Sequence, residues 1–159
     1  MRKLRNAILV IFAAILVGCA GTPMPTMTPM EIQSLQTREY ENPKEIVFPS
    51  VLSVFQDIGY TITNADLQTG LISAESATSS DASSRFWFGV TSTNQTRATA
   101  FIEQIGSITR ARVNFVEINQ TSSGYGQNDR SDTPLLNATI YQNAFEMIEN
   151  AIFVRASAQ

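Results

Sequence analysis

Two long segments of alternating side chains, residues 96–105 and 108–118, flank the dipeptide Gly106–Ser107. Successive side chains of a β-strand point to opposite faces of a sheet, so this alternation predicts strands with one buried face. We therefore predict a long antiparallel pair of strands joined at Gly106–Ser107. The second segment separates small and apolar side chains from polar ones, with Ala111, Val113 and Phe115 on one face and Arg110, Arg112 and Asn114 on the other.

Two amphipathic helices are predicted, one on each side of these strands in the sequence. The first helix has two possible starts. Asn42 would be its N-cap, with Pro43 at the first helical position, or the helix would begin at Phe48, with Pro49 in its first turn. It ends at Gly59, since glycine commonly follows a helix C-terminus, and the second helix ends near Val154 or Arg155. Apolar residues recur at helical spacing in both: Val47, Phe48, Val51, Leu52, Phe55 and Ile58, then Ile140, Tyr141, Ala144, Phe145, Ile148, Ala151 and Ile152.

Shorter segments complete the predicted sheet. A short strand or lead-in precedes the first helix, and residues 60–63 and 70–74 form a hairpin-like pair. The stretches 76–84 and 119–134 lack apolar periodicity and are expected to be loops. Residues 132–134, Asp-Thr-Pro, are expected to cap the final helix. We therefore predict a single α+β domain over residues 37–157, with an antiparallel sheet of four to five strands and both helices packed on one face.

The N-terminus has the order of a lipoprotein export signal. Arg2, Lys3 and Arg5 form a basic head, and residues 7–17 are an uncharged apolar run. Eleven residues are too few for a membrane-spanning helix, which needs about 20, but they suit the hydrophobic region of a secretory signal. Residues 16–19, Leu-Val-Gly-Cys, then resemble the bacterial lipobox and contain the only cysteine of the chain.

The lipobox resemblance implies cleavage between Gly18 and Cys19, with covalent diacylglycerol and an N-acyl chain on Cys19. One acyl chain holds a protein on a membrane only marginally, so several chains on one cysteine make the attachment stable. Ala20, in place of an aspartate, implies anchoring in the outer membrane with the domain facing the periplasm. The alternatives are a plain secretory signal with an incidental cysteine, or a short N-terminal anchor. No other cofactor is expected.

The predicted organisation is a cleaved signal over residues 1–18, a lipidated tether over residues 19–36 and the domain beyond it. Residues 22–35 contain three of the six prolines. Proline fixes φ and removes a hydrogen-bond donor, so we expect this stretch to be extended. A strand or a docking peptide is the alternative.

Charge and residue content exclude several functions. Cleavage would remove three basic residues and change the net charge from −3 to −6, which excludes a basic face for nucleic acid. The chain has no histidine, so Ser-His-Asp and Cys-His catalysis and histidine-containing zinc sites are excluded. Neither Glu146 with Glu149 nor Asp129 with Asp132 supplies the ligands of a metal site. We expect no enzymatic activity and no metal.

Two groups of residues are candidate binding surfaces. The aromatic patch, Phe86, Trp87 and Phe88, is either part of a strand that covers the sheet or a docking surface for a partner.

The second group is made of arginines predicted to lie on the solvent face of the sheet. They either pair with Glu103 and Glu117 across strands or contact an anion or a lipid headgroup. The three residues are Arg97, Arg110 and Arg112.

Packing patterns beyond the lipobox carry a resemblance to known proteins. They are residues 55–60, Phe-Gln-Asp-Ile-Gly-Tyr, running into 70–74, and residues 141–145 in the last helix. The chain resembles small, mostly uncharacterised bacterial outer-membrane lipoproteins, and in plan it is distantly similar to domains of the barrel-assembly lipoprotein BamC. The resemblance covers most of the chain and implies a fold and a place in the cell envelope more than an activity. The lipobox, the proline-rich tether, the absent catalytic groups and the aromatic patch lead us to expect a lipid-anchored domain that binds another envelope protein. A carrier for a lipid or cell-wall fragment is the alternative.

Overall fold

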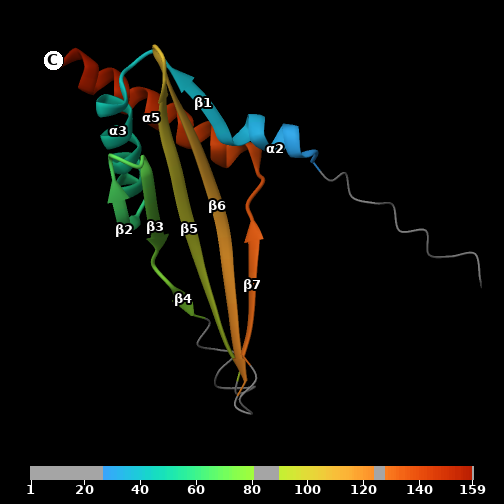
Figure 1. The fold of residues 1–159 in the computed structure, drawn as a ribbon. Helices are drawn as coiled ribbons and strands as arrows, with labels where there is room; N and C mark the ends of the chain where they lie inside the picture. Colours follow the sequence, from blue (N-terminus) through green and yellow to red (C-terminus); the bar gives the residue numbers. More distant parts are fainter. Residues whose placement is uncertain (1–26, 81–89, 124–127, 159) are drawn as a thin grey trace, which may run out of the picture.

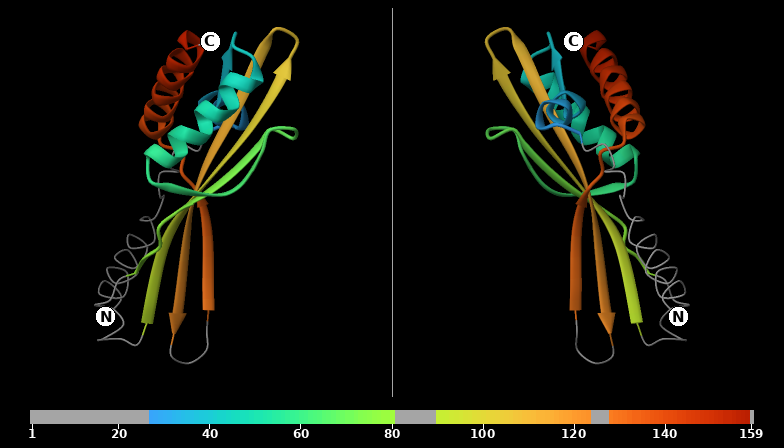
Figure 2. Two further views of the ribbon diagram at one scale, coloured as in Figure 1. Left: turned by 90° about the vertical axis from the view of Figure 1, so that its left-hand side faces the viewer. Right: turned by 90° about the vertical axis from the view of Figure 1, so that its right-hand side faces the viewer.

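The computed structural model describes residues 27–80, 90–123 and 128–158, which form a layer of helices against an antiparallel sheet (Figures 1 and 2). The predicted α+β class and the placement of both long helices on one face are confirmed, but this sheet has seven strands. The elements follow in the order α2 (Pro29–Gln36), β1 (Thr37–Tyr40), α3 (Lys44–Asp57), β2 (Tyr60–Asp66), β3 (Leu71–Ser76), β4 (Ser79–Ser80), β5 (Val90–Ile105), β6 (Ile108–Ser123), β7 (Asn128–Pro134) and α5 (Ala138–Ser157).

β5 and β6 form the centre of the sheet. They pair from Ile105 opposite Ile108 to Val90 opposite Ser123, so the predicted antiparallel pair is confirmed and is longer than expected. The order is β1-β6-β5-β3-β2, with β7 pairing β6 and β4 pairing β5. β1 and β7 therefore pair with the same edge of β6. β1 pairs with residues 109–112 and β7 with residues 116–122. The predicted hairpin-like pair is β2 and β3.

The core lies between α3, α5 and one face of the sheet. The β6 side chains that alternation predicted to be buried are buried, and so is most of the apolar stripe of each helix. Leu52 and Ala151 are half-buried, and Ile58, predicted to be part of the first stripe, is 37% exposed at the end of α3. The Phe115 ring lies 6.2 Å from the Phe55 ring and 5.4 Å from the Tyr141 ring, centroid to centroid, and both pairs are edge-on. The Phe115 N–H also donates to the Tyr141 hydroxyl at 3.4 Å. Aromatic packing and this hydrogen bond together hold α5 on the sheet.

Helix α3 begins at Lys44, which is close to the predicted start at Asn42 and excludes the start at Phe48. Its N-cap is Pro43, and the Lys44 N–H is satisfied by the Gln104 side-chain oxygen at 2.9 Å. The helix begins early because a side chain from β5 supplies the partner that a capping side chain usually provides. The predicted end before Gly59 is confirmed.

Helix α5 begins after Asn137, whose side-chain oxygen accepts from the Thr139 N–H at 2.9 Å. The prediction that residues 132–134 cap this helix is wrong, because they belong to β7. Ile140, predicted to be part of the buried stripe, is 37% exposed.

Part of the predicted tether is helical. In α2, Thr28 accepts from the Glu31 N–H, the Glu31 carboxylate accepts from the Thr28 N–H, and Pro29 occupies the first turn. This reciprocal capping satisfies two donors at the start of the helix. Leu35 then packs against the core. The extended conformation predicted for residues 22–35 is therefore wrong from Pro29 onward.

Two stretches predicted as loops contain strands. β4 lies within residues 76–84 and pairs with β5, while residues 119–134 contain the end of β6 and the whole of β7. All seven side chains of β7 are exposed, so this strand is held by backbone hydrogen bonds and not by burial.

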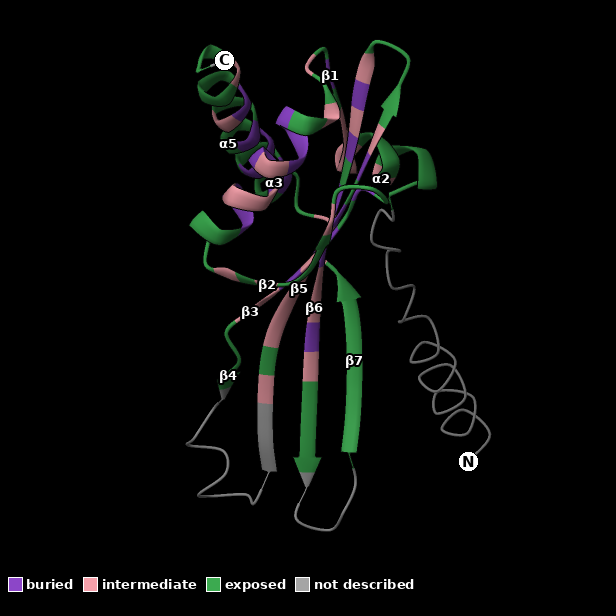
Figure 3. Ribbon diagram, turned by 60° about the vertical axis from the view of Figure 1, so that its left-hand side comes forward, coloured by how far each residue is buried: buried purple, intermediate pink, exposed green. Residues whose placement is uncertain are grey.

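These strands form an extension that we call the polar arm, made of residues 79–80, 90–95, 118–123 and 128–134. The polar arm projects away from α3 and α5, which lie at the opposite end of the sheet (Figures 1 and 3). The 16 residues of β5 span about 54 Å, compared with about 30 Å for the 20 residues of α5. No described helix covers either face of the polar arm (Figure 2).

Tyr40 is buried at the helical end of the sheet, and its hydroxyl has no hydrogen-bond partner among the described residues. Burial raises the pKa of Tyr40, and the negative charge of Glu149 acts in the same direction. The folded state therefore keeps the proton at a pH where the unfolded chain releases it, so this tyrosine lowers stability only above about pH 10.

We expect Tyr40→Phe to change the free energy of unfolding at pH 7 by less than about 1 kcal/mol, because no hydrogen bond is lost. Above about pH 10 the variant should lose less stability than the wild type. Urea unfolding at pH 7 and at pH 10.5 measures both effects. If the free energy of unfolding fell equally in the variant and the wild type between pH 7 and pH 10.5, the alkaline loss of stability would not be due to Tyr40.

Candidate functional site

Two predicted features lie outside the described residues. The cleavage and lipidation site, Gly18–Cys19, precedes residue 27, and the aromatic patch, Phe86, Trp87 and Phe88, falls between β4 and β5. Both remain predictions from sequence.

The three arginines lie on the face of the sheet away from α3 and α5, as predicted, because each alternates with residues buried under the helices. Arg110 and Arg112 are neighbours on this face of β6. Arg112 lies opposite Phe101, so Arg97 is four residues further along, or about 13 Å away. The arginines therefore share a face but do not form one cluster.

Carboxylates pair with two of these arginines. Arg97 contacts Glu75 at 3.1 Å, and Arg110 contacts Glu39 at 2.9 Å and Glu103 at 3.6 Å. The predicted pairing with Glu103 is confirmed. Half-exposed ion pairs of this kind contribute about 0.2–1 kcal/mol each, and their carboxylates oppose the binding of an anion at the same place.

The predicted pairing with Glu117 is wrong. Glu117 lies opposite Thr96 on β5 and Thr133 on β7, which places it on the other face of the sheet. Arg112 has no ion pair among the described residues.

The acidic residues do not converge. Within residues 27–80, 90–123 and 128–158, no three acidic, cysteine or histidine side chains are close enough to hold a metal ion. Asp129 and Asp132 are three residues apart on one strand, so they point to opposite faces. Arg130 hydrogen bonds to Asp132 and lowers the pKa of that carboxyl. Glu146 and Glu149 are exposed, as predicted.

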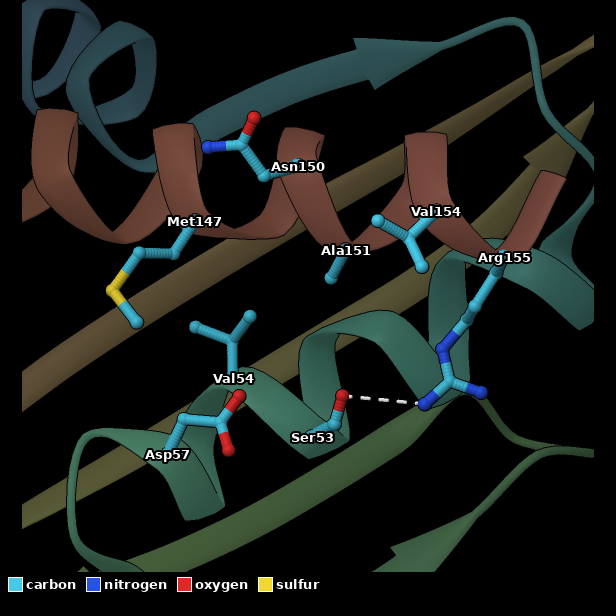
Figure 4. A pocket seen from close by; sticks show the side chains of 8 residues that line it. All are labelled: Ser53, Val54, Asp57, Met147, Asn150, Ala151, Val154 and Arg155. Carbon is cyan, nitrogen blue, oxygen red and sulfur yellow. Dashed lines mark hydrogen bonds between the residues drawn. The ribbon is translucent and has the colours of Figure 1, made fainter. Parts of the chain in front are cut away.

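The surface that sequence reasoning missed is a groove between α3 and α5 with a volume of about 440 Å³ (Figure 4). Val54 is buried at its floor, and Met147 and Val154 are exposed along α5. Asp57 lies at one end and Arg155 at the other, where the guanidinium donates to the Ser53 hydroxyl at 3.2 Å. The groove is lined by Ser53, Val54, Asp57, Met147, Asn150, Ala151, Val154 and Arg155.

A second hollow of about 220 Å³ continues the groove toward the start of α5. The two hollows share Met147, and the second is also lined by Ile140 and by Ile58 at the end of α3. Together they follow α5 from Ile140 to Arg155, which is about 22 Å of helix. We refer to them jointly as the helix groove.

Exposed apolar side chains recur every seven residues along the helix groove. Ile140, Met147 and Val154 are 37%, 37% and 64% exposed, and Asn143 and Asn150 lie between them. A seven-residue period keeps side chains on one flank of a helix and is the spacing used when two helices pack side by side. This spacing is visible in the sequence, but Ile140 is adjacent to Tyr141 and also fits the helical spacing of the buried stripe.

The fold and this surface define a two-layer α+β domain with an open, mostly apolar helix groove. Neither a search of known protein families nor a search of curated proteins found a match to the chain. Among the described residues, no helix has both the length and the apolar character needed to cross a bilayer.

Proposed function

We propose that this chain is a non-enzymatic, lipid-anchored protein of the bacterial cell envelope that binds an amphipathic helix of another envelope protein in the helix groove. The observation that carries the binding role is the exposed apolar series Ile140, Met147 and Val154 beside a groove of matching length. Anchoring in the outer membrane, with the domain in the periplasm, rests on the lipobox that ends at Cys19.

The shape of the helix groove favours a helix as the bound segment. A helix of about 15 residues has the length of the groove, and one apolar stripe would cover the three exposed side chains of α5. Asn143 and Asn150 remain available for polar contacts beside that stripe.

The two charges that line the first hollow also favour one orientation. Asp57 suits the positive end of a helix dipole and Arg155 suits the negative end. The bound helix would therefore have its N-terminus on the Asp57 side of the groove and its C-terminus near Arg155.

The alternative function, a carrier for a lipid or cell-wall fragment, has less support. A carrier needs an apolar cavity that encloses most of its ligand. The space between the sheet and the helices is filled by buried side chains, including Phe55, Tyr141 and Phe145, and the hollows described above lie at the surface.

A pair of substitutions on α5 tests the binding role. Val154→Glu places a charge in the helix groove and should weaken partner binding at least about tenfold, because an interface loses affinity when a charge replaces a buried apolar contact. Phe153→Glu is the matched control: Phe153 is 73% exposed and does not line the groove, so its replacement should leave binding unchanged.

The measurement is crosslinking in intact cells from a photoreactive amino acid at Asn150, within the groove. We expect a discrete adduct with an envelope protein that disappears with Val154→Glu and persists with Phe153→Glu. The proposal is rejected if no discrete adduct forms, or if both variants reduce it equally. Adduct formation with a lipid and not with a protein would favour the carrier.

A further inference from the structure

β7 is an edge strand whose outer side meets no described element. It pairs with β6 on one side, from Val116 opposite Pro134 to Ser122 opposite Asn128, and all its side chains are exposed. The free edge of a sheet presents unpaired N–H and C=O groups with which another strand can pair.

The hydrogen-bond pattern shows which backbone groups are free. The Leu135 N–H donates to the Phe115 carbonyl at 2.9 Å, which continues the β6–β7 ladder by one position. Alternate residues of an antiparallel strand direct their backbone groups to the same side. The groups of Ser131 therefore point to β6, as those of Leu135 do, and the groups of Arg130 and Asp132 point to the free edge.

The side chains of these two edge residues form an ion pair on one face of β7. Arg130 Nε lies 2.8 Å from Asp132 Oδ1, and a second guanidinium nitrogen lies 3.0 Å from Oδ2. A single-sign edge would repel a second copy of itself. This edge carries one charge of each sign, so it is electrostatically self-complementary.

We propose that β7 pairs with β7 of a second copy of this chain in antiparallel fashion, with the two-fold axis at Ser131, so that the sheet continues from one molecule into the other. In this register Arg130 of each copy lies opposite Asp132 of the other, and their free backbone groups face each other. Sliding the strands by two residues would place Arg130 opposite Arg130 or Asp132 opposite Asp132. Like charges directly opposite are destabilising, so the charges select one register.

The other face of the strand agrees with this register. Asp129 of each copy lies opposite Thr133 of the other, so a carboxylate meets a hydroxyl that can donate to it. Seven exposed residues make a small interface, which predicts weak association in solution. If both copies are anchored in one membrane, as in the proposed function, the local concentration rises and pairing becomes more complete.

Charge reversal tests the pairing in the full-length chain, by sedimentation in detergent across a range of protein concentrations. We expect the wild type to dimerise and Arg130→Asp to weaken dimerisation at least about tenfold. Asp132→Arg alone should act in the same way, and the double variant should restore dimerisation. Arg110→Asp, which breaks two half-exposed ion pairs elsewhere on the sheet, should have no effect.

A disulfide measures the register independently. Directly opposite residues without mutual hydrogen bonds have Cα atoms about 4.5 Å apart, within the range that a disulfide requires. Ser131→Cys should therefore give a disulfide-linked dimer on oxidation. Its amount should exceed that of any dimer which the wild type forms through Cys19. Thr133→Cys should not, because its two copies would be about 14 Å apart.

The pairing is overturned if the wild type remains monomeric at every concentration, or if the two cysteine variants crosslink equally. It is also overturned if dimerisation is insensitive to both single reversals. Val154→Glu in the helix groove should leave this dimer intact, so failure of the groove proposal and failure of the pairing proposal are distinguishable.

Discussion

On the proposal that Cys19 carries the lipid, replacing it by serine is expected to abolish lipid attachment and cleavage of the signal. The substitution preserves the shape of the segment but removes the thiol that would carry the lipid, and the lipoprotein peptidase cleaves only after lipid attachment. An unmodified precursor that retains residues 1–18 should therefore accumulate, without acyl mass. Mass spectrometry of the N-terminal peptide measures both effects.

Gly18→Ala is the matched control for this experiment, because it keeps a small side chain beside the cysteine and should be lipidated and cleaved normally. The lipoprotein assignment is wrong if the signal of Cys19→Ser is cleaved as efficiently as that of the wild type. An ordinary secreted protein would then replace it.

Replacing Gly70 by alanine is expected to cause a large loss of stability. Gly70 has φ +80°, and a Cβ atom added there would overlap the Ile102 carbonyl oxygen. The Ile102 N–H also donates to the Gly70 carbonyl at 2.8 Å, so β5 cannot move away without breaking a hydrogen bond. Left-handed strain and steric overlap together should lower the free energy of unfolding by at least about 3 kcal/mol.

Gly106→Ala separates these two causes. Gly106 also has a positive φ, +60°, but no atom lies within 4 Å of its added Cβ. This variant should lose only the strain of the left-handed conformation, about 1 kcal/mol. Urea unfolding measures the free energy of unfolding of both variants, which can be compared if their m values are equal. Equal midpoints for Gly70→Ala and Gly106→Ala would show that a small backbone shift relieves the contact with Ile102.

Sequence periodicity predicted the parts of the fold that bury side chains. Phe55 and Phe115 lie in patterns of period 3.6 and 2 because one face of α3 and one face of β6 meet in the core. β7 has no such pattern, since all its side chains are exposed and its pairing with β6 is specified by backbone hydrogen bonds. α2 was missed for a different reason: the spacing from Thr28 to Glu31 is a capping signal, but the nearby prolines were interpreted as a sign of extended chain.

The helix groove was harder to predict than the fold. Its two walls come from α3 and α5, which are separated in the sequence by β2 to β7 of the described chain, so no local pattern places Val54 beside Ala151. The seven-residue spacing of Ile140, Met147 and Val154 is visible in the sequence, but only the position of α3 shows that this flank is open. The arginine face was predictable because strand alternation alone determines it, whereas the partners of Arg97 and Arg110 depend on the register of β3 and β1.

The length of the central hairpin has a consequence for the order in which the chain folds. Near Gly106 the paired residues are close in sequence, but Val90 and Ser123 are separated by the whole hairpin. The entropic cost of closing the chain rises with that separation, and only the end near the turn gains from burial under α3 and α5. Pairing should therefore begin at the turn and proceed outward, and the polar arm should be the last segment to form and the first to fray.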